Sequence, residues 1–158
     1  MAPKSGSKNQ SAGLLLYRRR NAGFEVFLGH PGGPLWNKKD EGAWSIPKGL
    51  IVPGETQLAA AKREFAEETG RCPNGKSVPL GYAKQPGGKI VHVWALEGDF
   101  DPNNLRSNMF EMEWPPRSGK RQSFPELDRA AWFVIPEALR KILKGQAVFL
   151  ARLVEKLG

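Results

Sequence analysis

Apolar residues occur along this chain in short blocks separated by polar or glycine-rich segments. One block spans residues 11–17, a polar stretch with three arginines follows, and a second block spans residues 24–28, so the two predict strands joined as a hairpin. The segment Ile90–Leu96 is rich in β-branched and aromatic residues and predicts a further strand. Other strands are predicted at residues 78–83, 109–114 and 130–134.

Helical periodicity is clearest over residues 57–69. Thr56 and Gly70 have the chemistry of an N-cap and a C-cap, and nearly every residue between them favours a helix. The apolar stripe expected to face a core consists of Leu58, Ala61 and Phe65.

Two more helices are predicted at the end of the chain. Pro136 would begin the first, which ends at Gly145, and residues 146–157 would form the second. Strands on both sides of the central helix, followed by helices, predict an α/β fold in which helices cover a mixed sheet. The face of the last helix expected to pack on the sheet consists of Ala147, Leu150, Ala151 and Val154.

Length and composition favour an ordinary globular protein. With 158 residues, 40% of them hydrophobic, we expect one domain over residues 11–158 and a disordered tail, not a signal peptide, over residues 1–10. No run of about 18 apolar residues is present, so no membrane span is predicted. The single Cys72 excludes an internal disulfide and favours a reducing compartment, so we expect a cytoplasmic location. The sequence leaves the oligomeric state open.

The chain is strongly basic, with a formal net charge of +8. This charge favours polyanionic partners, which include nucleotides, nucleic acid and membrane surfaces, and does not choose among them. The basic segment Arg117–Gln122 could close over phosphates, or it could be only a solvated loop.

Three carboxylates share one face of the central helix. Glu64, Glu67 and Glu68 stand at positions i, i+3 and i+4, where like charges destabilise an isolated helix. Glutamates on a helix are often only a solvated face. A hard cation such as Mg²⁺, which takes oxygen ligands from carboxylates and substrate phosphates, would relieve the repulsion. The spacing therefore makes this helix a candidate metal platform.

The surrounding residues Gly49, Glu55, Arg63, Phe65 and Gly70 extend the pattern beyond the three glutamates. Their order resembles the signature of the Nudix hydrolase family, G-x5-E-x7-R-E-U-x-E-E-x-G-U, in which U is a bulky apolar residue. Arg71 departs from it, because it stands where the family usually buries an aliphatic side chain, and weaker packing is expected there. The matching positions are Gly49, Glu55, Arg63, Glu64, Phe65, Glu67, Glu68 and Gly70.

The resemblance implies an α/β/α sandwich and a hydrolase, dependent on Mg²⁺ or alternatively Mn²⁺, that acts on a nucleoside diphosphate linked to another group. It makes Glu64, Glu67 and Glu68 the metal ligands, joined by the backbone carbonyl of Gly49. Arg63 and Glu55 would orient these ligands. A helix glutamate, Glu67 or Glu68, or a glutamate from a distant loop would deprotonate the attacking water.

Residues outside the signature offer further candidates. Among the glutamates at 111, 113 and 126, we select Glu126 as the additional catalytic carboxylate. The Pro47–Gly49 lead-in resembles that of Nudix members acting on dinucleoside polyphosphates, and Lys48 would bind a substrate phosphate, although an exposed lysine there needs no function. His30 is expected at the surface, and His92 in the core or on a sheet face. The rings that could stack on a base are Trp36, Trp44, Tyr82, Trp94, Trp114 and Phe124.

Two functions remain open at this point. The first is pyrophosphate hydrolysis of a nucleotide, with a dinucleoside polyphosphate or a nucleoside triphosphate favoured and with ADP-ribose or an RNA end also compatible. The second is a nucleotide-binding or RNA-binding module that has lost turnover. The intact glutamate set argues against the second, because a pure binder has little reason to keep three crowded carboxylates.

Overall fold

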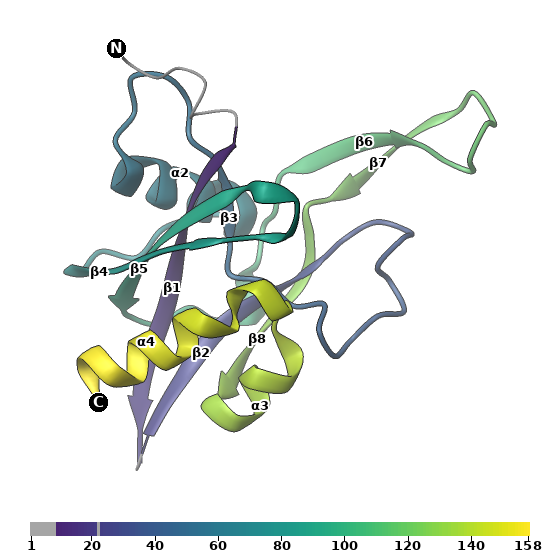
Figure 1. Cartoon of the computed structure of the whole chain (residues 1–158). Coiled ribbons are helices and arrows are strands. Elements are labelled where there is room, and N and C mark those ends of the chain that lie inside the picture. The colour runs from purple at the N-terminus through teal and green to yellow at the C-terminus, as the bar shows by residue number, and fades with distance from the viewer. Residues whose placement is uncertain (1–8, 22) are drawn as a thin grey trace.

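The computed structural model describes residues 9–21 and 23–158, so residues 1–8 of the tail predicted over residues 1–10 lie outside the described residues. Three helices and eight strands form the described part, with single 3₁₀ turns at residues 86–88, 102–104 and 144–146 (Figure 1). The elements are β1 (Gln10–Arg20), β2 (Gly23–Pro31), β3 (Lys48–Leu50), α2 (Gln57–Thr69), β4 (Ser77–Lys84), β5 (Ile90–Glu97), β6 (Met109–Glu113), β7 (Arg121–Pro125), β8 (Leu127–Val134), α3 (Ile135–Lys141) and α4 (Ala147–Leu157).

Strand β1 lies at the centre of a six-stranded sheet. The strand order is β4-β5-β1-β2-β8, and β3 pairs with the first part of β1, over Ser11–Gly13. The β1–β5 pair is parallel and the other pairs are antiparallel, which confirms the predicted mixed sheet. The predicted hairpin is also confirmed, because β1 and β2 pair from Tyr17 to Arg20.

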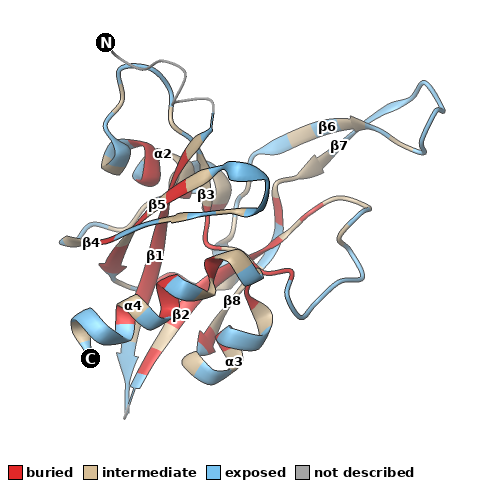
Figure 2. Ribbon diagram, viewed as in Figure 1, coloured by how far each residue is buried: buried red, intermediate tan, exposed pale blue. Residues whose placement is uncertain are grey.

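The apolar run in β1 is explained by burial on both faces of the sheet (Figure 2). Ala12, Leu14 and Leu16 point into the core that contains Phe65 of α2. Leu15 points into the opposite core, which contains residues of α3 and α4. Strands covered on both faces are typically continuous apolar runs, whereas half-exposed strands alternate. The resulting order of layers is the expected α/β/α sandwich.

Aromatic rings pack against one another in the core on the α2 face of the sheet. On the α2 face, the Phe65 ring lies 5.8 Å from the Phe27 ring and 6.3 Å from the Phe100 ring. Arg71, the departure from the signature, is itself exposed and its guanidinium lies 5.0 Å above the Phe100 ring. The expected loss of packing at that position is therefore partly replaced by a cation–π contact.

Both C-terminal helices differ from the prediction. Helix α4 buries Phe149, Leu150 and Leu153, while Ala151 and Val154 are exposed, so the predicted face was wrong for those two residues. Larger side chains gain more from burial, and they decide the rotation of the helix. Helix α3 ends at Lys141, because the Leu143 N–H donates to the carbonyl of Trp44 rather than continuing the helix.

Strands β6 and β7 form a separate hairpin that projects from the sheet (Figure 1). A basic loop was predicted at residues 117–122, but only residues 117–120 lie in the turn of this hairpin. Arg121 and Gln122 belong to β7 and pair with Glu113 and Met112. The short strands β3 and β7 were missed. The partner of β3 is β1, which is distant in sequence, whereas β7 pairs with the neighbouring β6 and begins inside the segment predicted as a loop.

We expect Phe65→Ala to lower the free energy of unfolding by about 3–5 kcal/mol, because it empties a fully buried site between two other rings. Chemical denaturation of the purified protein measures this change. Leu139→Ala is the control, since Leu139 is 50% exposed and should change stability by less than about 0.5 kcal/mol. Equal effects of the two substitutions would contradict the assigned core.

Candidate active site

Helix α2 begins and ends where the sequence predicts. The Thr56 hydroxyl accepts a hydrogen bond from the Ala59 N–H at 3.1 Å. Gly70 adopts a left-handed conformation with φ of 112°, and its N–H donates to the Ala66 carbonyl at 2.8 Å. These caps satisfy backbone groups that a helix terminus otherwise leaves unpaired. The carboxylate-bearing turn between them is therefore held rigidly.

Strand β3 brings the start of the signature against this turn. Its pairing with β1 places Gly49 so close to α2 that an added Cβ atom would lie 2.0 Å from the carboxyl carbon of Glu64. A similar restriction applies across the pair, where a Cβ atom on Gly13 would lie 2.9 Å from the Lys48 Cβ atom. Only glycine at position 49 lets the backbone and the Glu64 carboxylate share this space.

Arg63 links the loop before α2 to the acidic face. Its Nε and Nη2 atoms donate to the two oxygens of Glu55 at 2.6 and 3.0 Å, and Nη2 also donates to the Leu50 carbonyl at 2.9 Å. Its Nη1 atom donates to one oxygen of Glu64 at 2.8 Å and one of Glu67 at 3.1 Å. Arg63 thus orients two of the helix carboxylates, and Glu55 orients Arg63.

The loop before β6 attaches to the C-terminal end of α2. The N–H groups of Arg106 and Asn108 donate to the carbonyls of Thr69 and Glu67, at 2.8 and 2.9 Å. The Glu126 N–H in turn donates to the Asn108 carbonyl at 2.9 Å. This chain of backbone hydrogen bonds brings Glu126, which is 58 residues beyond Glu68 in the printed sequence, to the same pocket.

These elements enclose a pocket of about 320 Å³. Burial raises the pKa of Glu68 to about 8, the charges of Glu64 and Glu126 add to the rise, and the Lys48 ammonium and backbone N–H oppose it. Burial also raises the pKa of Glu64, although hydrogen bonding to Arg63 opposes it. The pocket concentrates negative charge. Its lining residues are Lys48, Gly49, Leu50, Glu64, Glu67, Glu68, Asn108 and Glu126.

The structure therefore brings together Lys48, Gly49, the three helix glutamates and Glu126, while Arg63 and Glu55 lie behind them. The other two candidate glutamates lie elsewhere: Glu111 is 3.4 Å from Arg121, and Glu113 accepts from the Gly119 N–H within the β6–β7 hairpin. Sequence reasoning missed Asn108, which has no motif of its own. Among the described residues, no three His, Cys, Asp or Glu side chains converge as a metal-binding group in this arrangement.

His30 is not at the surface, so that expectation was wrong. Its ring is fully buried; Nε2 donates to the Lys39 carbonyl at 2.6 Å, and Nδ1 lies 2.9 Å from an Asp128 carboxylate oxygen. Because both ring nitrogens have a polar partner, the ring is buried without an unsatisfied polar group, and these contacts hold the loop after β2 in place.

His92 lies half-buried on the sheet, where Nε2 contacts the Gln10 side chain at 2.7 Å, as expected for a sheet-face residue.

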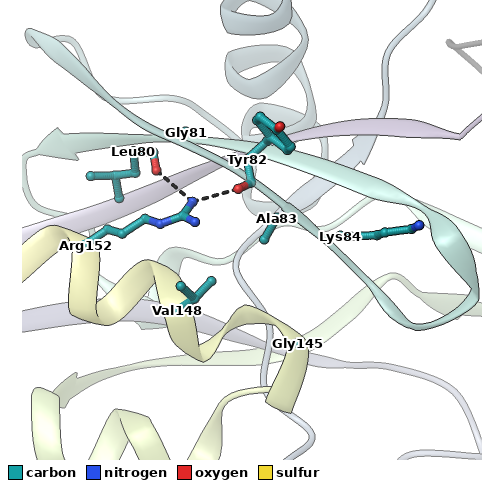
Figure 3. Close-up of a pocket in the computed structure, with 8 residues that line it drawn as sticks. All are labelled: Leu80, Gly81, Tyr82, Ala83, Lys84, Gly145, Val148 and Arg152. Atoms are coloured by element: carbon teal, nitrogen blue, oxygen red, sulfur yellow. Dashed lines mark hydrogen bonds between the residues drawn. The ribbon is translucent and has the colours of Figure 1, made fainter.

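A larger groove of about 740 Å³ lies elsewhere, between edge strand β4 and α4 (Figure 3). Arg152 Nη1 donates to the carbonyls of Leu80 and Tyr82, at 3.1 and 2.7 Å, and the Tyr82 ring lies on the opposite side of β4. None of the lining residues is acidic. The groove is larger than the acidic pocket, but the acidic pocket contains the groups suited to phosphate chemistry.

The chain belongs to the Nudix family, because the model of the NUDIX domain matches residues 7–153. An 8-oxo-(d)GTP phosphatase of Mycolicibacterium smegmatis is 41% identical over 66 residues, which cover 39% of this chain and 20% of that protein. An RNA pyrophosphohydrolase of Erythrobacter litoralis is 43% identical over 61 residues, which cover 39% of this chain and 33% of that protein. The matched part thus spans about a fifth to a third of these relatives.

Solved structures share the fold at lower identity. An Ap4A hydrolase of C. elegans, in a binary complex, gives a TM-score of 0.65 at 21% identity, with 93% of this chain and 97% of that chain covered. The NUDIX domain of Shewanella oneidensis NrtR, complexed with ADP ribose, gives 0.64 at 13% identity, with 94% and 88% covered. Within the described residues, no helix is both long and apolar enough to cross a membrane.

The Glu55–Arg63 pair predicts a pH-dependent contribution to stability. Hydrogen bonds from Arg63 hold the pKa of Glu55 below its usual value, so ionised Glu55 stabilises the fold above the pKa of the unfolded chain. This stabilisation is lost as pH falls through the folded pKa. We therefore expect Glu55→Gln to destabilise the protein at pH 7 and to approach the wild type in acid, as measured by urea unfolding from pH 7 to pH 3.

The control for that experiment is Glu41→Gln. Glu41 also pairs with an arginine, Arg140, at 2.7 Å, but both side chains are more than half exposed. Exposed ion pairs contribute little, so this variant should follow the wild type at every pH. The same pH profile for both variants would contradict the role assigned to the Arg63 contacts.

Proposed function

We propose that this chain hydrolyses a pyrophosphate bond in a nucleoside diphosphate-linked substrate, with Mg²⁺ as the cofactor and the acidic pocket as the site of reaction. The observation that carries the proposal is that four glutamates and one lysine, from three separate segments of a Nudix fold, line this one pocket. Carboxylates suit a metal, and a lysine ammonium suits a phosphate.

The residues of the pocket are suited to a divalent metal ion. The absence of a side chain at Gly49 lets the Glu64 carboxylate lie directly against the backbone of β3, and every acidic donor is an oxygen ligand of the kind Mg²⁺ prefers. The raised pKa of Glu68 reflects burial beside like charges, a condition that a cation relieves. Glu64, Glu67, Glu68 and the Gly49 carbonyl would hold the ion, and Mn²⁺ would meet the same ligands. When bound, the metal supplies charge neutralisation for the phosphates and activation of water near neutral pH.

Other residues of the site have separate tasks in this proposal. Lys48, which lines the pocket, binds a phosphate oxygen. Arg63 keeps Glu64 and Glu67 oriented, and Glu55 keeps Arg63 in place. A carboxylate of the pocket takes the proton of the attacking water, and Glu126 is the candidate that lies outside the helix.

Substrates of two kinds are favoured, dinucleoside polyphosphates and nucleoside triphosphates. The net charge of +8 supports highly phosphorylated substrates, and the names of the relatives include an 8-oxo-(d)GTP phosphatase, an RNA pyrophosphohydrolase and an Ap4A hydrolase. A 5′-triphosphorylated RNA end is the form in which nucleic acid would enter. The alternative of a binding module without turnover predicts ligand affinity in EDTA and no hydrolysis.

A substrate panel tests the proposal directly. With Mg²⁺, we expect nucleotide release from at least one of dinucleoside polyphosphates, nucleoside triphosphates, ADP-ribose and 5′-triphosphorylated RNA. Glu67→Gln and Glu68→Gln should each lower kcat by about a hundredfold or more, because each removes a charged oxygen ligand. Glu111→Gln is the control, since Glu111 lies on the projecting hairpin and is exposed. Hydrolysis that survives both substitutions or EDTA would contradict the proposal.

Metal binding should release a proton. Because the pKa of Glu68 is raised to about 8, this carboxyl is mostly protonated at pH 7 without metal, whereas a ligand must be ionised. We expect Mg²⁺ affinity to rise with pH up to about 8 and then to level off. Calorimetry in two buffers of different ionisation enthalpy measures the released proton. Release at pH 7 should fall in Glu68→Gln, and its absence from the wild type would contradict the assignment.

A further inference from the structure

A second cavity, of about 190 Å³, lies directly beside the acidic pocket. The two share Glu126, which lines both of them. Whereas the first is acidic, the second is mainly apolar and contains two aromatic side chains, Trp36 from the loop after β2 and Phe110 from β6. We call it the aromatic pocket, and its lining is completed by Met112, Leu35 and the segment Pro31–Gly33.

Two consecutive glycines build this pocket. The Gly32 N–H donates to the Glu126 carbonyl at 2.9 Å, and a Cβ atom on Gly32 would lie 2.0 Å from the Pro125 carbonyl oxygen. Gly33 has a φ of 94°, and a Cβ atom there would lie 3.0 Å from the Phe110 ring. Glycine at both positions therefore lets the loop after β2 lie against the base of the β6–β7 hairpin. This places Trp36, from the same loop, in the lining of the pocket with Phe110.

The rings of this pocket are not needed by the core. Trp36 and Phe110 are only half-buried, and neither belongs to the two core clusters of the sandwich. Leu35 is 59% exposed. By contrast, Trp44 is 95% buried against the rings of His30 and Phe133, and Trp94 packs on the α2 core. Unlike those residues, Trp36 and Phe110 expose ring surface to a cavity at the edge of the phosphate site.

We propose that the aromatic pocket binds the nucleobase of the substrate by stacking on Trp36 and Phe110, a proposal that rests on the function assigned to the acidic pocket. Every base has a flat π-face that an aromatic side chain can stack on. A base is joined to its 5′-phosphates only through one sugar, so a base in this pocket leaves its phosphates beside Glu126. Neighbouring cavities that share one wall suit that short separation.

The dimensions of the two cavities are consistent with this division. Sites for small molecules have volumes of roughly 300–1,000 Å³, so the aromatic pocket alone is small for a whole nucleotide and is suited to one ring system. The acidic pocket is larger and polar, as a phosphate site requires. The substrate class that follows is a nucleoside 5′-polyphosphate, free or as the terminal nucleotide of a longer molecule, whose base-bearing end enters beside Glu126.

Equilibrium binding tests the proposal with a readout other than catalytic activity. The probes are α,β-methylene analogues of ATP and GTP, with tripolyphosphate as a probe that has phosphates and no base. Trp36→Leu and Phe110→Leu keep apolar volume and remove the stacking face, so each should weaken binding of the better nucleotide by about 5- to 150-fold. Tripolyphosphate binding should stay unchanged, and Trp36→Phe should restore most of the nucleotide affinity.

Tyr82→Leu is the matched control, because Tyr82 is 60% exposed on edge strand β4, away from both pockets, and its replacement should change neither affinity. Thermal melting establishes that each variant is folded; should Trp36→Leu not fold, Phe110→Leu and Trp36→Phe carry the test. Saturation-transfer NMR provides a second readout. We expect saturation to pass from the protein to the base protons of the nucleotide with the wild type, and this transfer to the base protons to be weaker with Trp36→Leu.

The outcomes separate this proposal from the proposed function. Cleavage of a nucleotide together with wild-type affinity in Trp36→Leu and Phe110→Leu would overturn the base pocket and leave the hydrolase standing. Weaker nucleotide binding in those variants, with no cleavage by the wild type, would support the base pocket and contradict the hydrolase. An equal loss of tripolyphosphate affinity would overturn the base pocket, because stacking cannot act on a ligand without a ring.

Discussion

The burial of β1 on both faces is the constraint on which the rest of the molecule depends. Because its side chains alternate between two cores, α2 must cover one face of the sheet and the pair α3 and α4 the other. The first part of β1 also holds β3, and this pairing places Gly49 against Glu64. The position of the acidic pocket thus follows from the strand at the centre of the sheet.

Within the pocket, two opposing electrostatic effects are balanced over a few residues. Burial beside like charges disfavours ionised carboxylates, which explains the raised pKa values of Glu64 and Glu68. Arg63 offsets part of this repulsion through Glu64 and Glu67, and it is itself held by both oxygens of Glu55. Glu68 has no such contact with Arg63. It is therefore the carboxylate that gains most from an added cation.

The parts of the structure that could be predicted from sequence are those set by local signals. Thr56 and Gly70 define the ends of α2 through hydrogen bonds to residues three or four positions away, and the β1–β2 hairpin joins neighbours in sequence. The placement of Asn108 could not be predicted, because it depends on a backbone hydrogen bond to Glu67, and His30 was misplaced because its partner Asp128 lies on β8. The face of α4 was wrong because hydrophobic identity was weighed without side-chain size.

Strand β4 lies at the edge of the sheet, and side chains of α4 contact its backbone. An edge normally presents unpaired carbonyls and N–H groups that can recruit a strand from another molecule. Here the carbonyls of Leu80 and Tyr82 already accept hydrogen bonds from Arg152, and Lys156 donates to the Pro79 carbonyl at 2.9 Å. Pro79 itself has no N–H to offer. Two cations on α4 thus occupy backbone carbonyls that an edge strand would otherwise present to the strand of another molecule.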